Sequence, residues 1–148
     1  MKIKNLEVYE KCLIVVDMVN GFVREGVLHD EAIARTIPSQ TKLIKEYQKK
    51  RELVVFIKDS HDEDAVEFRS LVSSLKGLRE VEMVGCCTDI CVCNGAIALA
   101  NYFDQHNRNV SITIVEDGVE TYDSPTHNRA EYSKAAKVLM KQQGINFK

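Results

Sequence analysis

The stretch VGCCTDICVCNGAIALA, residues 84–100, decides how the chain folds. The apolar run that leads into it ends at Gly85, and small and polar residues follow. Apolar residues then recur at the spacing of one helix face, at Val92, Ala96, Leu99 and Phe103. The stretch is therefore predicted to form a strand, a tight turn and a helix.

The turn places a cysteine at the start of the predicted helix. Thr88 and Asp89 are the expected N-caps, because each has a side-chain oxygen that accepts hydrogen bonds from free backbone N–H groups. Cys91 then lies in the first helical turn, where the partial positive charge favours thiolate over thiol. The same N–H groups can hold the oxyanion of a tetrahedral intermediate. Cys91 is thus a candidate nucleophile, with an inert core cysteine as the alternative.

Residues 85–92, GCCTDICV, resemble the nucleophile turn of the isochorismatase-like cysteine hydrolases, and among these the turn is most similar to that of nicotinamidases. The resemblance implies an α/β fold of three layers, αβα, with a mostly parallel, open, Rossmann-like sheet. It places Cys91 on the family's nucleophile and implies a cis peptide bond between Cys86 and Cys87. It also implies that the backbone N–H groups of Cys87 and Cys91 form the oxyanion hole and that Cys87 contacts the substrate.

Composition indicates an ordinary globular protein. The chain has 148 residues, 45% of them hydrophobic and 28% charged, so one domain over residues 1–148 is expected. The net charge of -2 and the lack of a basic cluster argue against a nucleic-acid or membrane-surface partner and favour a small molecule. The charged first seven residues do not fit a signal peptide, and no stretch is long enough to cross a bilayer. A cytoplasmic location is therefore expected.

The five cysteines fit a reducing compartment better than a disulfide framework, because their number is odd and three lie within residues 86–91. Cys12, Cys86 and Cys93 are expected to fill the core as small hydrophobic residues. A zinc cluster of the four cysteines between residues 86 and 93 is rejected, because a second Cys-x-x-Cys pair is missing.

A second candidate residue closes the first buried strand. Residues 12–16, CLIVV, are predicted to form a strand covered on both faces of a parallel sheet, and Asp17 follows it. Ligands bind beyond the carboxyl ends of such strands, so Asp17 is a candidate site residue, with a turn or N-cap aspartate as the alternative. Residues 17–22, DMVNGF, resemble the first motif of the same family. The resemblance implies that Asp17 is the general base that takes the proton of Cys91 and that Phe22 packs on the substrate ring; a core aromatic is the alternative for Phe22.

The remaining elements follow from apolar periodicity. A helix is predicted over residues 31–50 with Pro38 in its first turn, and strands over 53–57 and 110–115. A last helix is expected to bury one stripe, made of Tyr132, Ala135, Ala136 and Leu139. His127, just before this helix, is expected to be a surface or capping residue, and residues 145–147 a short edge strand.

A metal site is implied after the strand over residues 53–57. Asp59 and His61, one residue apart, can point a carboxylate oxygen and an imidazole nitrogen at one cation, although a solvated acidic loop explains the same pattern. The resemblance to nicotinamidases adds Glu67 and implies that Asp59, His61 and Glu67 hold a divalent metal, zinc in first place and manganese or iron as alternatives. In that family the metal coordinates the pyridine nitrogen and orients the substrate.

The resemblance then stops. The family continues with a histidine that binds the metal and a strand that carries a catalytic lysine, whereas this chain passes through residues 68–76 almost directly to the nucleophile strand. About forty residues are missing relative to a whole family domain. Either the protein has lost this segment, or the sequence omits part of a longer chain. The second interpretation is favoured, because losing a buried strand from a parallel sheet exposes apolar faces and unpaired backbone groups.

These residues predict a cysteine hydrolase that deamidates nicotinamide to nicotinate and ammonia through a thioester, as in NAD salvage. The implied partner is a small carboxamide, and a homo-oligomer is expected. Two alternatives stay open: another amidase of the same family, and a binding protein without catalysis, which the missing lysine favours.

Overall fold

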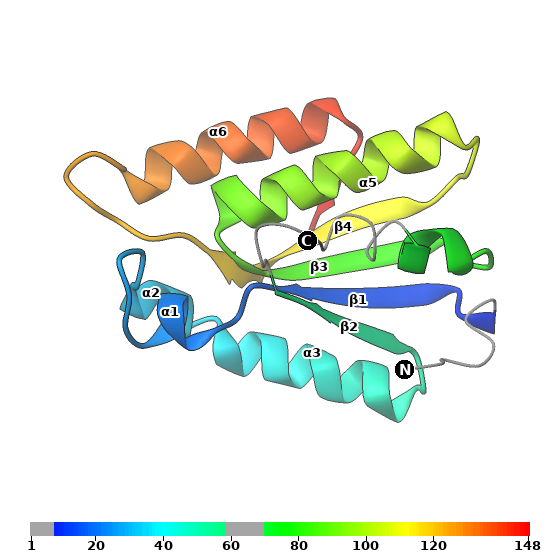
Figure 1. The fold of residues 1–148 in the computed structure, drawn as a ribbon, viewed down its shortest axis with the longest axis horizontal. Helices are drawn as coiled ribbons and strands as arrows, with labels where there is room; N and C mark the ends of the chain where they lie inside the picture. Colours follow the sequence, from blue (N-terminus) through cyan, green and yellow to red (C-terminus); the bar gives the residue numbers. More distant parts are fainter. Residues whose placement is uncertain (1–7, 59–69) are drawn as a thin grey trace.

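The computed structural model describes residues 8–58 and 70–148, which form one parallel sheet between two layers of helices (Figure 1). The strands lie in the order β2-β1-β3-β4-β5. Their bounds are β1 (Lys11–Val16), β2 (Leu53–Ile57), β3 (Glu80–Cys86), β4 (Ser111–Glu120) and β5 (Asn146–Phe147). The helices are α1 (Asn20–Val23), α2 (Glu31–Ala34), α3 (Ile37–Lys49), the π-turn η2 (Thr88–Val92), α5 (Cys93–Gln105) and α6 (Arg129–Gln142). The predicted three-layer α/β fold is confirmed.

Alternation along β1 explains why helices cover both faces. Cys12, Ile14 and Val16 lie in the core that contains α5 and α6, whereas Leu13 and Val15 pack in the core that contains α3. Successive side chains of a strand point to opposite faces, so a continuous apolar run needs a helical layer on each side. Cys12, Cys86 and Cys93 are at most 4% exposed, which confirms them as core residues.

Two expectations are corrected by the helices and β4. The helix expected over residues 31–50 is interrupted at Arg35 and Thr36, and Pro38 lies in the first turn of α3 as expected. The segment after Asp17 contains the short helix α1. The strand expected over residues 110–115 continues to Glu120, past a register shift opposite β3. This continuation depends on Gly118, because a Cβ there would lie 2.5 Å from Cγ1 of Val84.

The buried stripe expected on the last helix is wrong. Ala136 and Met140 face the core, but Tyr132 is 43% and Leu139 is 52% exposed. The backbone of α6 lies close to α5 at Ala136, whose carbonyl accepts a hydrogen bond from Cys93 Sγ at 4.0 Å. The buried face of α6 is therefore set by a small residue at the point where the two helices come close, and not by the largest apolar residues.

The edge position of β2 bears on the missing segment. β2 pairs only with β1 among the described residues, and its Phe56 is 68% exposed. A strand added after β2 would extend the sheet at this edge, so its loss would not open the middle of the sheet. The cost of losing a buried strand, which favoured an omitted segment, is therefore smaller than expected. That a segment is omitted from the sequence stays a prediction.

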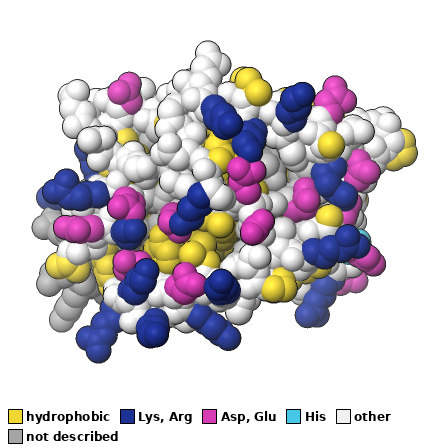
Figure 2. All heavy atoms as spheres, turned by 180° about the vertical axis from the view of Figure 1, so that it is seen from behind, with side chains coloured by type: hydrophobic (Ala, Val, Ile, Leu, Met, Phe, Trp, Pro, Cys, Tyr) yellow, Lys and Arg dark blue, Asp and Glu magenta, His cyan; other side chains and the backbone are white. Residues whose placement is uncertain are grey.

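The surface shows no large region of one charge on the face in Figure 2. Lys and Arg side chains are interspersed there with Asp and Glu side chains. None of the described helices combines the length and the apolar character that a membrane span requires.

Candidate active site

The candidate site lies where β1 and β3 end side by side. Val16, the last residue of β1, is the register partner of Gly85 in β3. A Cβ at Gly85 would lie 2.1 Å from the carbonyl oxygen of Val16, and its φ of 125° is one that other residues rarely adopt. Glycine at this position therefore lets the two strand ends approach, and the residues that follow them share one end of the sheet.

Asp17 is held by its backbone on both sides. Its N–H donates to the carbonyl of Ile57 in β2 at 2.8 Å, and its own carbonyl accepts a hydrogen bond from Cys86 Sγ at 3.3 Å. The residue is 3% exposed and has a φ of 51°, which few non-glycine residues adopt. These contacts fix the direction of its carboxylate.

The carboxylate of Asp17 is a hydrogen-bond partner of the Cys91 thiol. Burial of Cys91 raises the pKa of its thiol to about 12, and the hydrogen bond to Asp17 and the charge of Asp17 act in the same direction. The backbone N–H of Cys87 lowers this pKa, but the effect is smaller. The expectation of a thiolate stabilised by the helix is therefore wrong: at neutral pH the thiol keeps its proton, and a carboxylate lies ready to accept it.

The turn that carries Cys91 differs from the expected helix start. Its N-cap is Cys87, which makes no side-chain capping bond, so Thr88 and Asp89 are not N-caps. The carbonyl of Cys87 accepts hydrogen bonds from the N–H groups of Ile90 and Val92 at 3.1 Å each. These bonds form a π-turn, a rare geometry that is frequent at functional sites.

Cys87 contributes its backbone to the site and its side chain to the core. The peptide bond between Cys86 and Cys87 is cis, as the resemblance implied. The N–H of Cys87 faces the Cys91 sulfur, which is where a donor to a tetrahedral oxyanion is needed. The oxyanion role of Cys87 and Cys91 and a substrate contact of Cys87 stay predictions.

Among the cysteines of the turn, Cys91 is the one that a substrate can reach. A hydrogen bond between the thiols of Cys86 and Cys87 lowers the pKa of Cys87 and raises that of Cys86. Both residues, however, are at most 1% exposed. Cys91 is partly exposed. Access therefore favours Cys91 as the nucleophile, even though the pKa of Cys87 is lowered.

Phe22 lies in α1, next to this turn. Its ring is partly buried and packs against a small cluster of Ile33, Cys86 and Cys87. Both interpretations from the sequence, a wall of the substrate pocket and a core aromatic, fit this position.

Comparisons with known proteins agree with this fold. The family model described as the isochorismatase domain matches residues 11–77, and a search of curated proteins found no match. A nicotinamidase from Staphylococcus aureus shares 17% identity over 94% of this chain and 98% of its own, with a TM-score of 0.67. A pyrazinamidase of Pyrococcus horikoshii in complex with zinc shares 20% identity over 94% and 98%, with a TM-score of 0.67. An N-carbamoylsarcosine amidase from Thermoplasma acidophilum shares 21% identity over 94% and 95%, with a TM-score of 0.69.

The chain has the isochorismatase fold. This confirms the resemblance drawn from the sequence: the chain has the expected fold, and a pyrazinamidase is among the solved structures that share it.

The predicted metal ligands of this isochorismatase fold, Asp59, His61 and Glu67, lie outside the described residues. Within residues 8–58 and 70–148 no group of three or more His, Cys, Asp or Glu side chains is placed to hold a metal ion. The chain enters the segment from β2, whose Ile57 carbonyl accepts the Asp17 N–H at 2.8 Å. A metal held just beyond β2 would therefore lie at the same end of the sheet as Asp17.

Sequence reasoning missed His127. It was expected at the surface or as a cap, but it is 6% exposed, and Asn128 caps α6 instead. The Nε2 atom of His127 lies 2.8 Å from Oδ2 of Asp89, in the turn that carries Cys91. No pattern in the sequence indicates this pair, because it forms only when the loop before α6 returns over η2.

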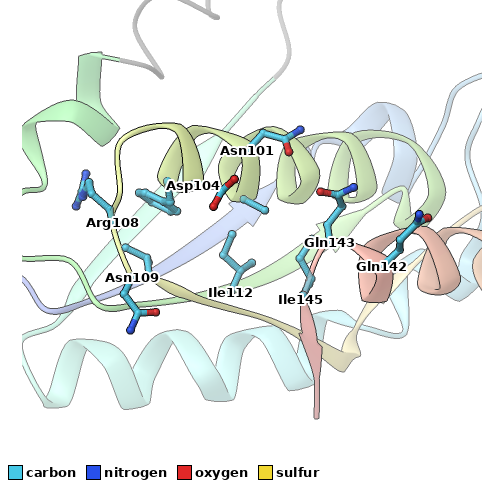
Figure 3. A pocket seen from close by; sticks show the side chains of 12 residues that line it. Asn101, Asp104, Arg108, Asn109, Ile112, Gln142, Gln143 and Ile145 are labelled. Carbon is cyan, nitrogen blue, oxygen red and sulfur yellow. The ribbon is translucent and has the colours of Figure 1, made fainter.

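A separate cavity of about 350 Å³ lies at the opposite end of the sheet (Figure 3). Its walls come from the end of α5, the start of β4 and the end of α6, and include Asn101, Asp104, Arg108, Ile112, Gln143 and Ile145. Parallel sheets bind ligands beyond the carboxyl ends of their strands, where Asp17 and the Cys91 turn lie. The cavity is therefore not part of the candidate active site.

Proposed function

We propose that the chain is a cysteine amidase that converts nicotinamide to nicotinate and ammonia. The contact between the Asp17 carboxylate and the Cys91 thiol is the observation that carries this proposal, because it joins a base to an accessible nucleophile. The nicotinamidase and the pyrazinamidase among the solved structures with this fold support the choice of an aromatic carboxamide.

In the first half of the reaction, one proton moves from the Cys91 sulfur to the Asp17 carboxylate and then to the leaving nitrogen. Asp17 takes the thiol proton as the sulfur of Cys91 attacks the amide carbon, and the N–H groups of Cys87 and Cys91 donate to the oxyanion. The protonated Asp17 then gives this proton to the leaving nitrogen, so that ammonia departs and a thioester remains. Asp17 next takes a proton from a water molecule that attacks the thioester and gives it to the leaving sulfur of Cys91, so that the acid departs and the thiol is restored.

A divalent metal fits the donor set of Asp59, His61 and Glu67, because two carboxylates and an imidazole suit zinc, manganese and iron. When bound, such a metal would hold the pyridine nitrogen of the substrate and so orient the carboxamide. No lysine of this chain matches the third catalytic residue of the family. The proposal therefore assigns proton transfer to Asp17 alone, and it retains the expected homo-oligomer, which light scattering on the purified protein would test.

The decisive experiment measures ammonia release. Purified protein is incubated with nicotinamide and, in parallel, with an N-carbamoyl amino acid, because one solved structure with this fold is an N-carbamoylsarcosine amidase. The expected result is release from nicotinamide by the wild type and none by Cys91→Ala. Cysteine-dependent release from the second compound alone would indicate another amidase of the same fold. If neither compound yields ammonia in a cysteine-dependent way, the chain is a binding protein.

A further inference from the structure

His127 and Asp89 form a buried ion pair beneath the turn that carries Cys91. Nε2 of His127 lies 2.8 Å from Oδ2 of Asp89, and the two side chains are 8% and 7% exposed. The imidazole is stacked between Tyr122 and Tyr132, with ring centroids 4.0 Å away on each side. The ring is therefore fixed in orientation as well as in position.

Both nitrogens of this imidazole face hydrogen-bond acceptors. Nε2 faces the Asp89 carboxylate, and Nδ1 lies 3.0 Å from the carbonyl oxygen of Tyr122. A neutral imidazole has only one N–H, so the imidazolium alone donates to both acceptors. Burial by itself lowers the pKa of His127, but the hydrogen bond and charge of Asp89 and the Tyr122 carbonyl outweigh it, and the pKa is raised. The titratable groups that face the ring are Asp89 from η2, Tyr122 from the loop and Tyr132 from α6.

Asp89 depends on this histidine. Its other oxygen, Oδ1, is buried and has no hydrogen-bond partner in the described part of the chain. A buried carboxylate without a partner is costly, so loss of His127 would drive Asp89 to turn outward toward water. Asp89 lies in the same π-turn as Cys91, so an outward movement of Asp89 would shift the backbone that carries the sulfur.

The loop that carries His127 is itself anchored at its end. Arg129 forms an ion pair with Asp30, the N-cap residue of α2, and its Nε donates to the Thr121 carbonyl at 3.0 Å. The backbone N–H of Asp123 also donates to Asp30, at 2.9 Å. Because the loop is held by α2, His127 is a fixed point to which the Cys91 turn is attached through Asp89.

We propose that His127 is a positioning residue: through Asp89 it holds the π-turn so that the Cys91 thiol faces the Asp17 carboxylate. The inference deepens the proposed function, and its turnover measurement rests on that function. The reactivity of Cys91 toward an alkylating agent does not depend on the proposed function, so this inference and the proposed function can fail separately.

The test compares His127→Gln with the wild type by the rate at which iodoacetamide modifies Cys91, followed on the Cys91 peptide by mass spectrometry. A released turn exposes the sulfur and separates it from Asp17, so alkylation at pH 8 should accelerate by about fivefold or more. Turnover of nicotinamide should become slower, with kcat lower by about tenfold and KM nearly unchanged. Asp89→Asn combined with His127→Gln should be no worse than either single change, because the two residues act as one pair.

Two variants serve as matched controls. His106 is also bonded to a tyrosine carbonyl and stacked on a tyrosine, but it is exposed and faces no carboxylate in the described structure, so His106→Gln should leave alkylation unchanged. Ile145→Val lowers stability in the core far from η2, and it should also leave Cys91 unchanged.

Two results would overturn the proposal. One is an alkylation rate in His127→Gln equal to that of the wild type. The other is an equal acceleration in Ile145→Val at the same loss of thermal stability, which would assign His127 a general structural role. If the wild type releases no ammonia at all, the alkylation rates still decide whether His127 positions Cys91.

Discussion

At the residue scale, catalysis depends on where one proton lies. The Cys91 thiol holds it at neutral pH, because burial and the nearby Asp17 carboxylate together raise its pKa to about 12. A thiol with so high a pKa is a poor spontaneous nucleophile, which protects it from unspecific modification. In the proposed mechanism it becomes reactive when a substrate carbonyl is in place and the proton can move to Asp17.

Asp17→Asn separates thiol reactivity from catalysis. The change removes the charge and the hydrogen bond that raise the pKa of Cys91, so more thiolate is present at pH 8 and alkylation by iodoacetamide should accelerate. Each unit by which the thiol pKa falls raises the thiolate fraction at pH 8 by about tenfold, and the alkylation rate rises by less, because a less basic thiolate is a weaker nucleophile. Ammonia release should be lost at the same time, because no base remains. Asp104→Asn, on the exposed end of α5, is the control, and slower alkylation in Asp17→Asn would contradict the assignment.

The sequence predicted where Asp17 and Cys91 lie, but it did not predict which of the two holds the proton. The strand before Asp17 and the position of a turn at Cys91 were correctly predicted, because apolar runs and a family motif mark them, whereas the N-cap and the π geometry of the turn were not. The raised pKa of Cys91 was missed, because burial of the sulfur and the approach of Asp17 arise from pairing between β1 and β3. The partner of Asp89 was missed because it comes from the loop before α6, which returns over η2 only in the folded chain.

At the element scale, the strands were easier to predict than the helix faces. Each predicted strand was found, with β4 longer than expected. The buried face of α6 was wrong, because Tyr132 and Leu139 point outward while Ala136 meets α5. Hydropathy alone cannot identify a face that is selected by how closely two helix backbones approach.

Gly85→Ala tests the close contact between β1 and β3. A Cβ at this position would lie 2.1 Å from the backbone oxygen of Val16, which cannot move without breaking strand pairing. The free energy of unfolding, measured in urea, should fall by about 3 kcal/mol or more. Gly21→Ala is the matched control, because nothing lies within 4 Å of its Cβ. Equal stabilities of the two variants would show that β1 and β3 do not approach as described.

The His127–Asp89 pair should make stability depend on pH. The pKa of His127 is raised in the folded protein, so the pair's contribution is fully present below the unfolded pKa of about 6.5 and is lost as pH rises through the folded pKa. The difference in unfolding free energy between the wild type and His127→Gln should therefore shrink as pH increases from 6 to 9. A difference that grows over this range would mean that the histidine is buried in its neutral form.

At the scale of the whole molecule, the parallel sheet collects the functional groups at one end. Asp17 follows β1, and the Cys91 turn follows β3, which pairs with β1. The cavity in Figure 3 lies at the other end and takes no part. The three-layer fold was predictable from apolar periodicity and the family motif, whereas the order of the strands, with β2 at an edge, was not.

Metal binding is expected to depend on the residues just beyond β2. Equilibrium dialysis of the metal-free protein against zinc should show binding that is lost in His61→Ala, because imidazole is a strong zinc ligand. His29→Ala is the matched control, since His29 is an exposed histidine in the loop before α2. Equal zinc binding by His61→Ala and the wild type would exclude His61 as a ligand.

The central claim is that Asp17 and Cys91 act as one unit, and a double-mutant cycle on ammonia release from nicotinamide tests it most directly. Asp17→Ala and Cys91→Ala should each lower kcat by about a thousandfold or more, and the double variant should be no slower than either single one. Turnover by Asp17→Ala near the wild-type rate, with none by Cys91→Ala, would contradict the account.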